Sequence, residues 1–134
     1  MSRILNGRAR GSSFMKEHSM TIKRFHVGAR MSDAVVHNGT IYLAGQVAKD
    51  PSQDTAGQTA QILATIDALL AECGSDKTRI LSAQIFLADI AEFKAMNEVW
   101  DAWVPAGHTP ARATVESKLA TPKYRVEIKV VAAA

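Results

Sequence analysis

The residues best suited to chemistry lie near the C-terminal end of the sequence. The segment P-A-R-A-T-V-E (residues 110–116) alternates small or apolar residues with Arg112, Thr114 and Glu116. In a β-strand, a spacing of two places these three polar side chains on one face. Glu127 follows in a second segment with the composition of a strand. An arginine and a carboxylate therefore stand on two successive predicted strands.

Arg112 and Glu127 could together form an anion site. A guanidinium offers paired donors that match a carboxylate, and a neighbouring carboxylate can hold and activate water. If their strands pair through a short, even-numbered turn, both side chains point to the same face. From spacing alone, an ion pair between the two, or two solvated strand residues, is the simpler interpretation. The pattern indicates an α+β domain with a hint of an anion site.

Other common chemistries lack their usual marks in this sequence. There is no G-x-x-x-x-G-K-[ST], G-x-G-x-x-G, H-E-x-x-H or G-x-S-x-G motif. The four histidines and the single cysteine show no spacing typical of zinc ligands, so no metal site is predicted. Cys73 lies on the apolar face of a predicted helix, where we expect a buried and inert thiol.

The hydrophobic pattern predicts the elements that must position these residues. Alternating or β-branched segments predict strands over residues 22–27, 32–36, 40–44, 80–87, 111–115 and 125–131. Apolar residues at helical spacing predict one helix that stops at Gly74 and a second that ends at Pro105. This order predicts an α+β fold, a single mixed β-sheet with both helices on one face. The other face would be bare in a monomer, so we expect an oligomer.

Each predicted helix opens with a capping-box pattern. Thr55 and Gln58 precede the first apolar stripe, and Asp89 with Glu92 opens the second helix. The second stripe consists of Phe93, Met96, Trp100 and Trp103. We interpret its two tryptophans as core or interface packing instead of ligand stacking.

Size and charge restrict the classes of function. The chain has 134 residues, the size of one domain, and no apolar run approaches the ~20 residues that cross a bilayer. The first 30 residues carry seven basic and one acidic residue, whereas the remaining 104 carry nine basic and twelve acidic ones. Because an extended phosphate track needs a basic surface, nucleic acid is not an expected partner of this body.

Residues 1–20 are set apart by composition. They are rich in arginine and serine and hold one acidic residue. We expect a disordered or non-native leader here, with Met20 as an alternative start, and a single domain over residues 21–134. One cysteine excludes an internal disulfide and suits a reducing cytosol, so we expect a cytoplasmic protein. The leader also has the composition of an organellar transit peptide, which leaves organellar targeting open.

An ordered set of short motifs resembles the RidA (YjgF-type) reactive-intermediate deaminase family, as a divergent branch. The resemblance covers about residues 21–133. Its pieces are M-S-D-A-V-V from Met31, N-G-T-I-Y-L-A-G-Q from Asn38, a helix with Gln61 that ends at Gly74, F-L-A-D from Phe86, F-K-A-M-N from Phe93, T-P-A-R-A-T-V-E from Thr109 and V-E-I from Val126. Each piece alone is weak, and the full set at these spacings is specific.

The resemblance implies a fold, an assembly and a reaction. The family fold is a sheet packed by two helices, assembled as a homotrimer with sites between subunits. The implied activity is hydrolysis of enamines and imines such as 2-aminoacrylate to 2-keto acids and ammonia, with neither a metal nor an organic cofactor. Arg112 matches the arginine that binds the substrate carboxylate, and Glu127 the glutamate that positions water. The segment Ala44-Gly45-Gln46 lies where the family lines the pocket.

The sequence departs from the best-known branch of this family at three substrate-binding positions. Met31 stands where that branch has a tyrosine, Ala44 where it has a serine, and Thr114 where it has a cysteine. These changes remove polar contacts to a ligand, whereas Arg112 and Glu127 remain. The resemblance therefore predicts the reaction type better than the substrate.

Two other functions stay open at this point. The same Arg112 pocket could serve a non-catalytic keto-acid or amino-acid binding module. RNA cleavage or translation inhibition, reported for some relatives, is the third hypothesis. Retention of Glu127 favours an enzyme over a binder, and the acidic body speaks against the RNA hypothesis.

Overall fold

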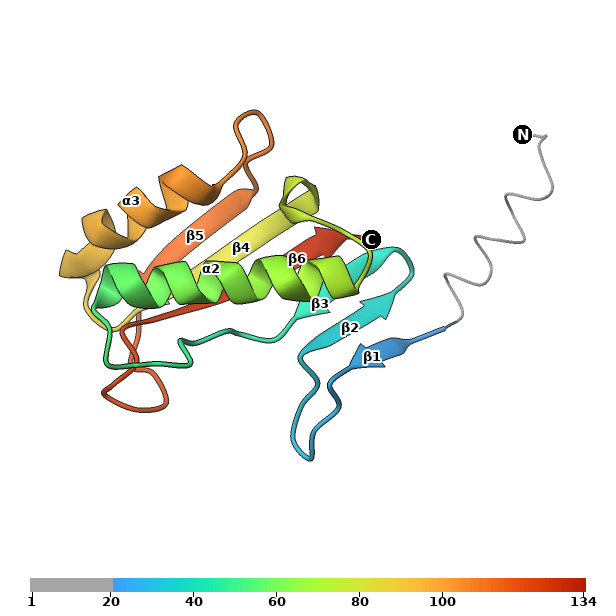
Figure 1. Cartoon of the computed structure of the whole chain (residues 1–134), viewed down its shortest axis with the longest axis horizontal. Coiled ribbons are helices and arrows are strands. Elements are labelled where there is room, and N and C mark those ends of the chain that lie inside the picture. The colour runs from blue at the N-terminus through green and yellow to red at the C-terminus, as the bar shows by residue number, and fades with distance from the viewer. Residues whose placement is uncertain (1–20) are drawn as a thin grey trace.

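The computed structural model describes residues 21–134, and the predicted leader lies outside these described residues (Figure 1). Its elements follow the predicted order, with the addition of two short 3₁₀ turns. They are β1 (Lys23–Phe25), β2 (Ala34–His37), β3 (Thr40–Leu43), α2 (Thr55–Glu72), η1 (Lys77–Arg79), β4 (Ile80–Leu87), η2 (Ile90–Glu92), α3 (Phe93–Trp103), β5 (Ala111–Glu116) and β6 (Val126–Ala133).

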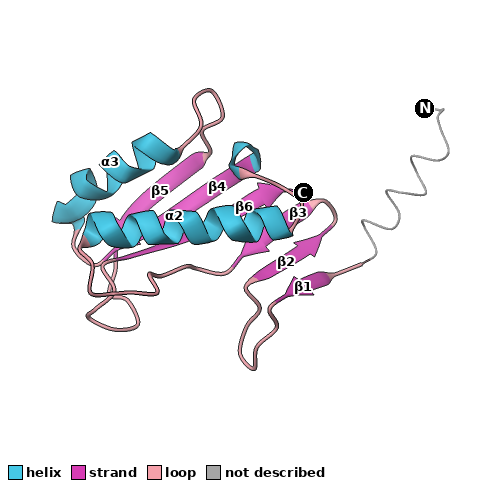
Figure 2. Ribbon diagram, viewed as in Figure 1, coloured by secondary structure: helices cyan, strands magenta, loops and turns pink. Residues whose placement is uncertain are grey.

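The six strands form one mixed sheet in the order β1-β2-β3-β6-β4-β5. All neighbours are antiparallel except β4 and β5, which run parallel. Both helices lie on the same side of the sheet, with α2 across its middle and α3 beside β5 (Figures 1 and 2). The predicted α+β class, with two helices on one face of a mixed sheet, is confirmed. No helix among residues 21–134 has the length and apolar character needed to cross a membrane.

The predicted pairing of the last two strands is wrong, because β4 lies between β5 and β6. Parallel strands need a crossover connection, and α3 supplies it between β4 and β5. This crossover leaves β5 at the sheet edge. The chain then returns through the Thr121 turn, where Tyr124 N–H donates to the Thr121 carbonyl. It enters the sheet on the other side of β4.

The turn between β2 and β3 is the hairpin that the sequence predicts. Asn38 and Gly39 both have positive φ, at 53° and 78°, and His37 pairs with Thr40 across them. Two consecutive residues with positive φ match the twist of the flanking strands, which explains the Asn-Gly pair. The hairpin fixes the register of β3, and so the position of the segment that follows it.

The core lies between the helices and the sheet. The stripe on α2 buries Ile62, Ile66 and Leu70 completely, against Ile85 of β4 and Ile128 of β6. Gly74, with a φ of 78°, ends the helix in the left-handed conformation that glycine adopts without strain. Cys73 is partly buried beside this core, and burial raises the pKa of its thiol, which fits the expected inert role.

The two predicted capping boxes do not form. Asp54, one residue earlier than expected, caps α2 by accepting the Gly57 N–H at 2.8 Å. Asp89 caps η2 instead of α3, because a 3₁₀ turn precedes that helix. The Glu92 side chain turns away from Asp89 and accepts a hydrogen bond from the Thr55 hydroxyl. Glu92 thereby joins the starts of both helices.

Gln58 is a buried polar residue that connects three parts of the chain. Its amide nitrogen lies 3.0–3.1 Å from the carbonyl oxygens of Pro51, Gln53 and Lys123. Its amide oxygen accepts the Arg125 N–H at 2.9 Å. The loop before α2 and the loop before β6 are thus held by one side chain. This contact sets where β6 begins, and with it the position of Glu127.

Replacing Gln58 with leucine should destabilise the fold by about 2–3 kcal/mol, because the change leaves several backbone groups in this buried region without partners. Urea unfolding measures the difference. The matched control is Gln61→Leu on the same helix, where the amide bonds only the exposed Asp50 backbone. It should cost under about 1 kcal/mol. Equal losses for both variants would contradict a special role for Gln58.

Candidate active site

Arg112 projects from the edge strand toward the helices. It is in register with Ala83 of β4, which is buried in the core, so both side chains point to the helix-covered face. The guanidinium carbon lies 5.2 Å from the ring centroid of Trp100 and 5.9 Å from that of Phe93. Among the described residues, no ion pair joins Arg112 to a carboxylate.

Glu127 projects from the opposite face of the same sheet. It is in register with Phe86, three residues along β4 from the partner of Arg112, so the two side chains lie on alternate faces. Its neighbours Val126 and Ile128 are fully buried on the helix side of the sheet, which agrees with Glu127 pointing to the other side. The prediction that Arg112 and Glu127 share one face of the sheet is therefore wrong. It assumed that β5 and β6 pair directly, whereas β4 lies between them. The alternative of an ion pair between Arg112 and Glu127 within one chain is also excluded.

Glu127 instead lies against the backbone of Gly45. Gln46 holds this segment beside β6, through hydrogen bonds of 2.8 and 3.0 Å with Ile128. A Cβ atom on Gly45 would stand 2.0 Å from the Glu127 Oε2 atom. Only glycine permits this close approach. The predicted pocket residue Gly45 and the predicted catalytic residue Glu127 are thus brought together.

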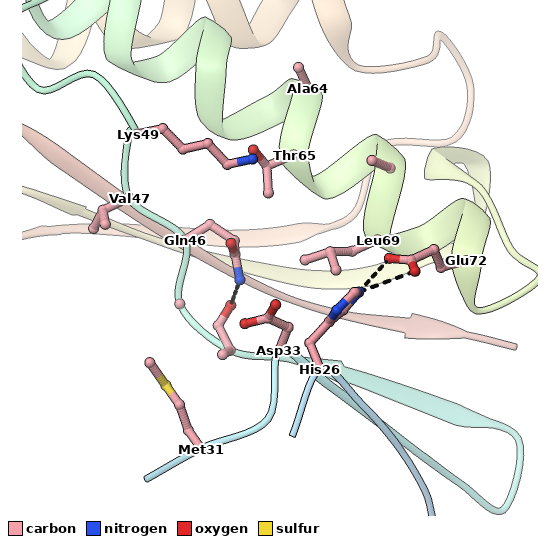
Figure 3. Close-up of a pocket in the computed structure, with 13 residues that line it drawn as sticks. His26, Met31, Asp33, Gln46, Val47, Lys49, Ala64, Thr65, Leu69 and Glu72 are labelled. Atoms are coloured by element: carbon pink, nitrogen blue, oxygen red, sulfur yellow. Dashed lines mark hydrogen bonds and ion pairs between the residues drawn. The ribbon is translucent and has the colours of Figure 1, made fainter. Parts of the chain in front are cut away.

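A groove of about 780 Å³ lies between α2 and the segments around Met31 and Gly45 (Figure 3). Its lining includes Met31, Ala44 and Gly45, three of the predicted substrate-binding residues. Ala44 is fixed there, because its N–H donates to the Asp33 carbonyl and its carbonyl accepts the Gln46 amide, both at 2.9 Å. Arg112, Thr114 and Glu127 are not part of this lining.

One wall of the groove carries an ion pair. The His26 Nε2 atom lies 2.9 and 3.1 Å from the two carboxylate oxygens of Glu72, as the dashed lines in Figure 3 mark. The hydrogen bond and charge of Glu72 raise the pKa of His26, with a small contribution from Asp33. The contact therefore stabilises the fold while His26 is protonated. That contribution is lost as the pH rises through the raised pKa.

Thr114 shares the helix-covered face with Arg112. Its Oγ1 atom is buried and lacks a hydrogen-bond partner within residues 21–134, and the same holds for the Oδ1 atom of Asn97 on α3. Buried polar atoms are normally paired, so these two are exceptions among the described residues. Glu116 accepts the Ile90 N–H at 3.3 Å, which is a structural contact.

The predicted site residues thus form two groups. Arg112 and Thr114 lie between β5 and α3, whereas Met31, Ala44 and Gly45 line the groove, with Glu127 behind Gly45. No three histidine, cysteine or acidic side chains of the described range gather as metal ligands would.

This fold and these residues have close counterparts among known proteins. The sequence model described as Endoribonuclease L-PSP matches residues 21–134. A YjgF-family member from Neisseria meningitidis has a crystal structure that superposes with a TM-score of 0.84 at 52% identity, covering 87% of this chain and 97% of that one. The architecture and the match define the class, a small α+β protein of the YjgF type.

The chain belongs to the Endoribonuclease L-PSP family, also known as the YjgF/RidA family. It is 55% identical to the RutC family protein YoaB of Escherichia coli K12, covering 85% of this chain and 99% of the relative. It is 30% identical to the 2-iminobutanoate/2-iminopropanoate deaminase of Rattus norvegicus, covering 90% of this chain and 92% of that protein. The predicted family resemblance is confirmed.

Sequence reasoning missed the aromatic contacts of Arg112. Phe93 and Trp100 are seven residues apart, the spacing of one helix face, and that face was assigned to packing alone. The parallel β4–β5 pairing brings this face over Arg112. The wall formed by His26 and Glu72 was also missed, because the two residues are distant in sequence and carry no motif.

Substituting Gly45 with alanine should displace the Glu127 carboxylate while costing only about 1 kcal/mol of stability. The low cost is expected because the far end of a flexible side chain can move aside. A crystal structure of Gly45→Ala and its thermal unfolding check both parts. In the double variant with Glu127→Asp, the shorter side chain leaves room and stability should recover. A Glu127 carboxylate unmoved in Gly45→Ala would contradict the close-approach interpretation.

Proposed function

We propose that this protein hydrolyses reactive 2-imino acids and their enamine forms, of the 2-aminoacrylate type, to 2-keto acids and ammonia. The observation that carries the proposal is Arg112, whose guanidinium has aromatic faces on its flanks and no carboxylate partner among the described residues. Such a guanidinium is available to a substrate carboxylate in bidentate geometry. The 30% identity to a 2-iminobutanoate/2-iminopropanoate deaminase supports the same reaction.

The chemistry needs positioning and proton transfer. Arg112 holds the carboxylate, which fixes the adjacent C=N carbon relative to a water on Glu127. Glu127 takes a proton as the water oxygen bonds to this carbon, and the nitrogen gains the electron pair of the C=N bond and a proton. The resulting carbinolamine loses ammonia, while the hydroxyl proton leaves and the C=O bond forms. One water enters and one ammonia departs, and a single carboxylate serves as base and then acid.

A site that uses both Arg112 and Glu127 requires two copies of the chain, since the two side chains lie on opposite faces of one sheet. This separation supports sites between subunits, as in the homotrimer that the family resemblance implies. The edge position of β5 leaves Arg112 accessible to a neighbour. On the face away from the helices, Tyr42 and Val115 remain about half exposed, which suits an interface.

The charge of the body favours a deaminase over RNA cleavage or translation inhibition. Residues 21–134 carry twelve basic and twelve acidic side chains, so the body has no net positive charge to attract a phosphate backbone. A non-catalytic keto-acid binding module would also use Arg112 to hold a carboxylate. It would not need Glu127 as a base, so the role of Glu127 distinguishes an enzyme from a binding module.

Arg112→Ala should lower kcat/KM for 2-iminobutanoate by roughly 30-fold or more, because it removes a charge-assisted contact to the substrate carboxylate, worth about 2–5 kcal/mol for a desolvated pair. Arg112→Lys should recover little, since an ammonium lacks the planar fork. Glu127→Gln should keep 2-ketobutyrate binding and lower turnover roughly 100-fold. The assay follows keto-acid release with imine generated by a dehydratase. A Glu127→Gln enzyme as fast as wild type would refute the assigned role of Glu127.

Light scattering at micromolar concentration should give the mass of three chains, because the uncovered sheet face and the divided site both require neighbours and the family resemblance implies a homotrimer. Introducing a charge at the half-exposed Val115, as in Val115→Asp, should shift the mass toward one chain and abolish turnover together. Lys118→Asp, a charge reversal just beyond β5, serves as the control. A wild-type mass of a single chain would contradict a site formed between subunits.

A further inference from the structure

We propose that Phe93 and Trp100 form an aromatic platform that positions the Arg112 guanidinium and thereby sets the affinity for a carboxylate. The platform consists of these two side chains only. The inference rests on the proposed function and assigns two positioning residues to it. Neither ring needs to touch the reacting atoms, since both act through Arg112.

The geometry places both rings on the arginine. The guanidinium carbon lies 5.2 Å from the Trp100 centroid and 5.9 Å from the Phe93 centroid, within the ~6 Å reach of a cation–π contact. Phe93 and Trp100 are two turns apart on one face of α3, and Arg112 extends from β5 toward this face. Trp100 is only 5% exposed, whereas Phe93 is 40% exposed. The Trp100 ring is therefore embedded in the core, and the Phe93 ring lies at the surface.

The buried Trp100 ring packs against the ring of Trp103. The Trp103 ring lies 5.4 Å from that of Trp100, and its indole N–H donates to the Asp67 carboxylate on α2 at 3.0 Å. Lys77 lies 5.1 Å from the Trp103 ring centroid and donates to the Trp103 carbonyl at 2.8 Å. Contacts from α2 and from η1 thus hold Trp103, which in turn packs against the Trp100 ring beside Arg112.

Aromatic faces position an arginine differently from a carboxylate. A carboxylate would neutralise the charge and occupy the N–H groups, so a substrate would have to displace it. A ring face attracts the cation and accepts no hydrogen bond from the edge of the guanidinium. The platform therefore orders a long side chain before the substrate arrives and leaves its paired donors free, which lowers the entropic cost of binding.

The experiment compares pyruvate with pyruvamide, its neutral amide, by calorimetry on the full-length protein. Phe93→Leu and Trp100→Leu should each weaken pyruvate binding roughly 3- to 10-fold, or about 0.7–1.4 kcal/mol at about 1.4 kcal/mol per tenfold. Pyruvamide binding should stay unchanged, because it carries no charge for Arg112. For 2-iminobutanoate, KM should rise by the same factor, with kcat within about twofold. Trp100→Phe keeps a ring and should bind pyruvate nearly as wild type does.

The matched control is Phe25→Leu, which removes another ring under a cation, Lys23 at 5.4 Å, on the strand at the opposite edge of the sheet. It should leave pyruvate binding unchanged. Phe93 is exposed enough that Phe93→Leu decides the question even if Trp100→Leu fails to fold. Wild-type pyruvate affinity in Phe93→Leu, or equal losses for pyruvate and pyruvamide, would overturn the platform while the proposed function stands. Undiminished pyruvate binding by Arg112→Ala would overturn the proposed function itself.

Discussion

Arg112 and Glu127 lie on opposite faces of the sheet because their register partners on β4, Ala83 and Phe86, are three residues apart, and the arrangement of the site depends on this separation. β4 pairs in parallel with β5 and antiparallel with β6, so the crossover helix α3 must cover β5. That helix brings aromatic rings to the arginine. The same topology places β6 beside the segment after β3, where Gly45 receives the Glu127 carboxylate. Each half of the site is therefore built by its own local packing.

The pattern-based predictions succeeded where a single periodic signal determines the structure. The stripe on α2, the Asn38-Gly39 turn and the stop at Gly74 each follow from local preference, and the structure agrees with all three. The order of strands and helices limited the fold to a mixed sheet with one covered face. The matched motifs placed the chain in its family, because they occur in order over nearly the whole of the described range.

Other features could not be predicted because they depend on tertiary contacts. Strand order is set by which edges meet, and the sequence contains no local signal that β6 enters between β3 and β4. The capping boxes failed for a related reason. Gln58 matches the capping pattern, yet its amide nitrogen contacts two carbonyls of the preceding loop and the distant Lys123 carbonyl instead. Glu92 likewise prefers Thr55 and Arg125, 3.2 Å away, over its own helix start. Polar side chains with several possible partners are poorly constrained by spacing alone.

The central position of β6 has a consequence for how the chain is made. β6 is the last strand in the described sequence, yet it joins β3 on one side and β4 on the other. During synthesis, the β1–β3 hairpins and the β4–α3–β5 unit emerge first and have no hydrogen-bonded connection to each other. The sheet closes only when the final strand has left the ribosome. Such long-range pairing slows folding, so the nascent chain depends on its unpaired β3 and β4 edges remaining protected until then.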